Sequence, residues 1–273
     1  MWKLARRVPL LWVCILCLPM SGWSQVSPGS VYLEELTTQE VSHLLRKSPS
    51  IIIIPVGGTE QNGPHMAIGK HNVRVKVLAG RIAAQLGNAI VAPVVAYTPE
   101  GRITPPTEHM PFAGTISIPD DAFKELLLST ARSFKQHGFT EIVLFGDSGN
   151  YQSLLAAVAD GFNRESAKSQ TRMHYIADYY KATQTGYISA LKAKGLSAAE
   201  IGTHAGSADT SLLMAIDSTM VKPDKFAEAA KSGWKGGTLG DPRASTAVLG
   251  QLGAEAVVKI TVQTIQKAIE KAR

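Results

Sequence analysis

Residues 51–56 of the chain read Ile-Ile-Ile-Ile-Pro-Val, a run without any polar side chain. A strand with this pattern has to be covered on both faces, as the strands of parallel sheets are. Apolar side chains at helical spacing follow it, at Val75, Leu78, Ala79, Ile82 and Leu86. A buried strand followed by a helix with one apolar face is the unit of a layered α/β structure, so this part of the chain predicts a sheet packed under helices.

The same alternation continues along the rest of the chain. Further strands are predicted at 89–96, 142–145 and 173–176, and further helices at 36–45, 123–134, 153–158 and 258–269. Strands that alternate with helices favour an α/β fold with a largely parallel sheet flanked by helices. About 250 residues can bury one full core, and no repeat or low-complexity stretch indicates a second domain.

The first 24 residues have the pattern of a secretory signal peptide. Lys3, Arg6 and Arg7 precede an apolar stretch, 8–18, that is too short to span a bilayer, and Gly22 and Ser24 suit a cleavage site. The alternative is an uncleaved membrane anchor. A signal peptide predicts a mature domain at 25–273 that is periplasmic or secreted and has no stable membrane insertion.

Both cysteines, Cys14 and Cys17, lie inside the predicted signal. The mature chain would therefore form no disulfide, and a metal site would need His, Asp, Glu or Asn ligands. Loss of the three basic residues of the signal lowers the formal net charge from +6 to +3. That charge is too small to indicate a nucleic-acid partner.

Three long stretches rich in glycine and proline interrupt the alternation, at 57–72, 97–119 and 232–246. Long ordered loops in a compact domain are usually functional. The first two directly follow predicted strands, so they should meet at the carboxyl edge of the sheet, where α/β proteins place their sites. Glu108 and His109, in the second loop, could line a pocket there.

Five motifs stand in order along the chain. They are VGGTEQNGPHMAIGKHN (56–72), PFAGTISIP (111–119), LFGDSGN (144–150), HAGSADTSLLMA (204–215) and GGTLGDPRAST (236–246). The first resembles TEQHGPHLPLGTD, the signature of the creatininase family of metal-dependent amidohydrolases. The others resemble that family's FPGTISL, NGHGGN, HAGxxETSLML and GxxGDPxxAT. One such motif is a weak signal, but five in order cover most of the mature chain.

The resemblance implies a two-metal site, but this chain departs from it at four positions. Glu60 is retained, whereas Asn62 and Asp147 replace histidines, His71 replaces an aspartate and Asp209 replaces a glutamate. The implied ligand set is Glu60, His71 and Asp147 around one Zn²⁺ or Mn²⁺ ion. Asn62 is a neutral, weak ligand that would leave a second ion weakly held or absent, and Asp209 is one methylene shorter than the glutamate it replaces. Lys70, beside this site, could pair with a carboxylate or repel a cation.

The implied activity is metal-dependent hydrolysis of a C–N bond in a small amide or cyclic amide. Glu60 and His204 would be the catalytic residues, with His204 assisting proton transfer. The resemblance also implies a homo-oligomer. Two alternatives stay open: an inactive, ligand-binding relative with altered metal positions, and a serine hydrolase that uses Ser148 in the GDSGN turn.

Overall fold

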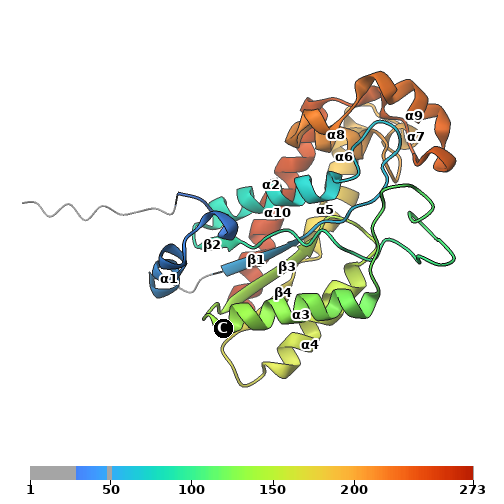
Figure 1. The fold of residues 1–273 in the computed structure, drawn as a ribbon. Coiled ribbons are helices and arrows are strands. Elements are labelled where there is room, and N and C mark those ends of the chain that lie inside the picture. The colour runs from blue at the N-terminus through green and yellow to red at the C-terminus, as the bar shows by residue number, and fades with distance from the viewer. Residues whose placement is uncertain (1–28, 48–50, 273) are drawn as a thin grey trace, which may run out of the picture.

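The computed structural model describes residues 29–47 and 51–272, so the expected signal peptide lies outside the described residues. Four strands form one parallel sheet in the order β2-β1-β3-β4 (Figure 1). They are β1 (Ile51–Val56), β2 (Ala89–Val91), β3 (Glu141–Gly146) and β4 (Arg172–Tyr175). This confirms the predicted single α/β domain with a parallel sheet.

Helices cover both faces of the sheet. Along β1, Ile51 and Ile53 belong to one apolar core and Ile52 and Ile54 to the other, as the alternation of strand side chains requires. The first core is closed by α2 (Lys70–Leu86), α5 (Asp178–Gln184) and α10 (Ala247–Ala272), and the second by α1 (Thr38–Lys47), α3 (Asp120–Gln136) and α4 (Gln152–Glu165). Figure 1 shows α2 and α10 on the opposite side of the sheet from α3 and α4.

Four shorter helices gather at one end of the molecule (Figure 1). They are α6 (Gly186–Ala193), α7 (Ala198–Ile201), α8 (Ser207–Ile216) and α9 (Phe226–Ser232). Single 3₁₀ turns lie at Leu33–Glu35, Ser218–Met220, Pro223–Lys225, Trp234–Gly236 and Pro242–Ala244. Among the helices of the described ranges, none combines the length and the apolar composition needed to cross a bilayer.

Several boundaries differ from the sequence-based expectations; α10, for example, begins at Ala247 rather than near residue 258. β2 ends at Val91 rather than near residue 96, because Pro93 has no N–H to donate to a neighbouring strand. Val95 still makes an isolated parallel bridge to Val56. The first long loop ends at Gly69, because α2 begins at Lys70. Lys70 and His71, expected in that loop, therefore lie in the first turn of a helix.

Candidate active site

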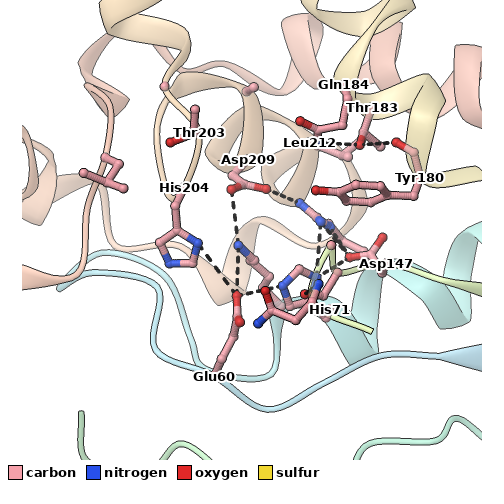
Figure 2. A pocket seen from close by; sticks show the side chains of 18 of the residues that line it. Glu60, His71, Asp147, Tyr180, Thr183, Gln184, Thr203, His204, Asp209 and Leu212 are labelled. Atoms are coloured by element: carbon pink, nitrogen blue, oxygen red, sulfur yellow. Dashed lines mark hydrogen bonds and ion pairs between the residues drawn. The ribbon is translucent and has the colours of Figure 1, made fainter. Parts of the chain in front are cut away.

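A pocket of about 270 Å³ lies at the carboxyl end of the sheet (Figure 2). Parallel pairing of Val56 with Gly146 sets the ends of β1 and β3 side by side, and the amide of Asp147 donates to the carbonyl of Val56 at 3.0 Å. The loop after β1 contributes Glu60 to the pocket, and the turn after β3 contributes Asp147. The segment before α8 contributes His204, and the first turn of α8 contributes Asp209. The predicted convergence of the loops at 57–72 and 97–119 is confirmed, because the amide of Ile116 donates to the carbonyl of Thr59 at 2.9 Å.

Glu60 is the carboxylate on which most of the pocket's basic groups converge. Its Oε1 lies 2.8 Å from His71 Nε2, 3.7 Å from Lys70 Nζ and 3.8 Å from His204 Nδ1. Its Oε2 lies 3.4 Å from His109 Nε2. Burial alone would raise the pKa of Glu60, but His71 and Lys70 outweigh it and lower the pKa well below its usual range, so the side chain is ionised at neutral pH.

Asp147 is buried, and both of its carboxylate oxygens accept hydrogen bonds from neighbouring side chains. Its Oδ2 accepts from Arg74 Nε at 2.9 Å and Arg74 Nη2 at 2.6 Å, and lies 2.6 Å from His71 Nδ1. Its Oδ1 accepts from the Tyr179 hydroxyl at 2.9 Å. Burial works to raise the pKa of Asp147, but Arg74 and His71 outweigh it and lower the pKa. The aspartate is thus held as a fixed carboxylate by neighbouring donors.

Asp209 is the third carboxylate of the pocket, and like Asp147 it accepts hydrogen bonds from neighbouring donors. It accepts from Arg74 Nη1 at 2.7 Å, from Lys70 Nζ at 3.2 Å and from the amide of Ala205 at 2.9 Å. Lys70 and Arg74 are themselves almost fully buried. Of the two roles considered for Lys70 from the sequence, the structure shows the carboxylate pair.

The structure brings together four of the five residues predicted as metal ligands. His71 stands between Glu60 and Asp147, and hydrogen-bonds both directly (Figure 2). Asp209 joins them through Arg74. Asn62 differs, because its Nδ2 donates to the carbonyl of Glu60 at 2.9 Å, and it is not among the residues lining the pocket. Glu60, His71, Asp147 and Asp209 are thus joined by hydrogen bonds and ion pairs within the chain, directly or through Arg74. Their polar atoms are not arranged around a shared vacant position.

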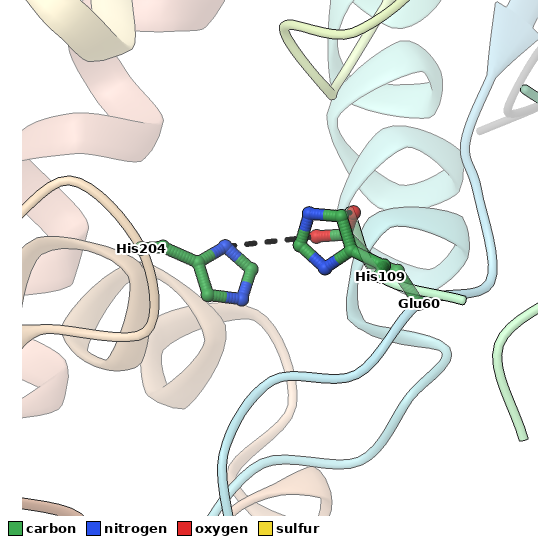
Figure 3. A group of neighbouring side chains, drawn as sticks. All are labelled: Glu60, His109 and His204. Carbon is green, nitrogen blue, oxygen red and sulfur yellow. Dashed lines mark ion pairs between the residues drawn. The ribbon is translucent and has the colours of Figure 1, made fainter. Parts of the chain in front are cut away.

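A second group in the pocket has the character of a metal site. Among the described residues, Glu60, His109 and His204 each offer one ligand atom, and these atoms lie within 4.8 Å of one another (Figure 3). A carboxylate with two imidazoles suits Zn²⁺ or Mn²⁺. From sequence, His109 was expected only to line a pocket. Its position in a long loop after a strand was the signal, but no motif marked it as a ligand.

The details of these three side chains fit a divalent ion. Glu60 Oε2 is buried and has no hydrogen-bond partner among the described residues. His204 Nε2 lies 3.1 Å from the carbonyl oxygen of Gln61 and 3.2 Å from its side-chain Nε2. In the tautomer that donates from Nε2 to this carbonyl, the lone pair of Nδ1 is directed toward Glu60. Burial lowers the pKa of His204 to about 3 and also lowers that of His109. Both imidazoles are therefore neutral at pH 7, as metal ligands must be.

An aromatic wall stands beside this group. The ring of Trp234 is 5.3 Å from that of His109, 5.8 Å from that of His204 and 5.7 Å from that of Phe112. Trp234 is 38% exposed, so one side of the indole faces the outside. The pocket is thus polar around Glu60 and apolar toward its opening, a common combination in small-molecule sites.

Ser148 lacks the surroundings of a serine nucleophile. The Ser148 hydroxyl oxygen accepts from the amide of Asn150 at 3.4 Å. Within residues 29–47 and 51–272, no histidine or carboxylate hydrogen-bonds that hydroxyl. A serine hydrolase needs such a base next to its nucleophile. The geometry therefore gives the serine alternative no support.

Comparison with known proteins agrees with the resemblance. A sequence model of the creatininase family, described as creatinine amidohydrolase, matches residues 34–265. The chain belongs to the creatininase family. Its match extends from the 3₁₀ turn before α1 into α10, so it includes the whole sheet and every residue of the pocket described above.

Individual members of the creatininase family match over most of the chain. A mycofactocin precursor peptide peptidase of Mycobacterium ulcerans (strain Agy99) is 30% identical over 244 residues, which cover 80% of this chain and 85% of the relative. A creatinine amidohydrolase of Pseudomonas putida is 25% identical over 209 residues, which cover 73% and 76%. A solved creatinine amidohydrolase has a TM-score of 0.74 at 22% identity and covers 88% of this chain and 98% of its own.

These relatives support a hydrolase of the creatininase family. Other solved structures of this fold are described as creatininase Mn and as a mutant creatininase of Zn–Zn type. The manganese and zinc ions in these descriptions are those of the solved proteins and do not identify the metal of this chain. In this chain, the donor atoms of Glu60, His109 and His204 form a possible metal site of their own.

Proposed function

We propose that this protein hydrolyses the C–N bond of an amide or cyclic amide in a small molecule, with one Zn²⁺ or Mn²⁺ ion held by Glu60, His109 and His204. The observation that carries the proposal is the convergence of these three donors in a pocket of about 270 Å³. When bound, such an ion lowers the pKa of a water molecule and polarises a carbonyl group. The family's hydrolase members support the reaction class.

The remaining residues of the pocket have roles that follow from their contacts. The Gln61 carbonyl orients the His204 ring, and His71 and Lys70 keep Glu60 ionised. The Lys70 ammonium lies in the pocket wall, where it can stabilise negative charge on a substrate oxygen. Trp234 covers the two imidazoles and limits access of water. The proton-transfer role expected for His204 stays a prediction.

Metal titration of the protein tests the proposal. After treatment with a chelator, the native protein should take up about one equivalent of Zn²⁺ or Mn²⁺. His109→Ala should lower the metal affinity by more than ~10–100-fold, the cost of losing a residue that only hydrogen-bonds to a metal ligand. His43→Ala is the control, because His43 is exposed on α1, away from the pocket. Native protein that takes up no ion would contradict the proposal.

A second candidate function is ligand binding without catalysis. It is favoured by one observation: Asp147 and Asp209 are occupied by side-chain donors. A binding protein would retain a small polar ligand in the pocket when Glu60 is neutralised to Gln. A hydrolase would lose metal and turnover together.

We also propose that the protein is exported, a proposal supported by the basic and apolar pattern of residues 1–24. N-terminal sequencing of protein made in its own host should find a chain that begins near Gln25. An intact Met1 on protein from the cytosol would rule this out. The homo-oligomer expected from the family resemblance is likewise a proposal, and sedimentation analysis of the purified protein would decide it.

A further inference from the structure

The first five residues of α2 include three basic side chains that all line the pocket. Lys70, His71 and Arg74 occupy positions i, i+1 and i+4 of this helix. Their partners are the three carboxylates of Glu60, Asp147 and Asp209, which come from three different segments of the chain. The start of one helix thus compensates the negative charge that three separate segments bring together.

These cations are in an unfavourable place for the helix itself. The N-terminus of a helix carries a partial positive charge, so cationic side chains in the first turn are destabilising. α2 has no acidic residue in its first turn and no side-chain cap. Lys70 and Arg74 also lose nearly all their hydration. Their position is therefore explained by the carboxylates they contact and not by the stability of α2.

The contacts leave no room for a divalent ion between Asp147 and Asp209. Arg74 spans the two carboxylates, with Nη2 and Nε on Asp147 and Nη1 on Asp209. Lys70 then takes the other oxygen of Asp209. An ion at this place would have to displace both side chains, and it would leave the buried Arg74 without its carboxylate partners and Lys70 with Glu60 alone, which is strongly unfavourable.

We infer that Lys70 and Arg74 are built-in cations that take the place of a divalent ion at Asp147 and Asp209, and that they restrict the pocket to a single metal ion. The count of one rests on the proposed function, which assigns an ion to Glu60, His109 and His204. The exclusion at Asp147 and Asp209 rests on the two side chains alone. One solved structure of this fold is described as a mutant creatininase of Zn–Zn type.

Counting bound ions in the native protein gives the first test. Protein stripped with a chelator and saturated with Zn²⁺ or Mn²⁺ should hold no more than one ion per chain, measured by elemental analysis after gel filtration. Two ions would overturn the inference but leave the proposed hydrolase intact. No ion would overturn the proposed metal-dependent function, whereas it would agree with the exclusion at Asp147 and Asp209.

Removing the built-in cations gives the second test. The double variant Lys70→Gln/Arg74→Gln leaves Asp147 and Asp209 without their cations, so it should bind one ion more than the native protein. Its melting temperature should rise by roughly 5–10 °C when Mn²⁺ or Zn²⁺ exceeds the Kd about 100-fold. The extra ion would supply the charge that the two side chains supply in the native chain.

Two further variants keep this test decisive. Lys76→Gln is the control, because Lys76 is on the same helix as Lys70 and Arg74 but pairs with Glu34 at the surface. This variant should bind no additional ion. Lys70→Gln alone keeps Arg74 and serves if the double variant does not fold; it should gain a weaker metal response. A folded variant of either kind without Lys70 that takes up no additional ion would overturn the inference.

Discussion

Replacing Arg74 with methionine should lower the free energy of unfolding by about 3–5 kcal/mol, the cost of removing one partner from a buried ion pair. Arg74 is buried and bridges Asp147 and Asp209, so its loss strands two carboxylates whose other donors cannot replace three guanidinium bonds. Methionine keeps much of the side-chain volume, and the effect therefore reports charge and hydrogen bonding rather than a cavity. Urea denaturation followed by circular dichroism measures it.

Arg132→Met is the matched control for Arg74→Met. Arg132 also contacts two carboxylates, Glu125 and Glu165, but its side chain is 45% exposed. Water screens such surface pairs, so this substitution should change stability far less. Equal losses in the two variants would contradict the assignment of Arg74 as the central cation of the buried network.

The pH dependence of the Arg74→Met effect has a definite sign. Arg74 helps to lower the pKa of Asp147, and, with Lys70, that of Asp209. A carboxylate whose pKa is lowered by folding contributes stability at neutral pH. That contribution is lost as the pH falls below the ordinary aspartate pKa of about 4 and then through the lower pKa of the folded state. The difference between native protein and variant should therefore shrink in acid. A difference that stays constant down to that range would mean that Arg74 acts by packing alone.

Glu60→Gln should have the largest effect on metal binding and turnover. The amide has nearly the same shape as the carboxylate but removes the charge that His71, Lys70, His109 and His204 face. We expect metal affinity to fall at least ~100-fold, more than most substitutions of residues that only hydrogen-bond to a metal ligand. Isothermal titration with Zn²⁺ or Mn²⁺ measures this without knowledge of the substrate, and circular dichroism checks the fold.

Glu108→Gln is the control for Glu60→Gln. Glu108 precedes His109 in the chain, but its side chain is exposed and does not line the pocket. Its variant should bind metal as the native protein does. If Glu60→Gln also kept full affinity, the ion would not be held by Glu60, and the proposed site would be wrong.

The sheet and the helices that cover it could be predicted because their patterns are strong. β1 is apolar throughout, and α2, α3 and α10 repeat apolar residues at helical spacing. The helices α5 to α9 were not predicted. They are short, and their residues pack against one another and against loops, so no regular apolar stripe marks them.

The candidate site was predictable only in its residue types. The family motifs indicated Glu60, His71 and Asp147, and the structure brings these residues together. Arg74 was missed, because an arginine in an amphipathic helix usually marks the exposed face. Its only signal was the spacing of four residues from Lys70, which places both side chains on one side of α2. Which donor satisfies which carboxylate depends on three-dimensional packing that no local pattern encodes.

The position of Trp234 has a spectroscopic consequence. The four tryptophans of the chain are Trp2, Trp12, Trp23 and Trp234, and the first three lie within the predicted signal. If the signal is removed as proposed, Trp234 is the single tryptophan of the mature protein, and its indole contacts His109 and His204. Tryptophan emission from the native chain then originates at the mouth of the pocket, so the unmodified protein carries its own optical probe of what enters there.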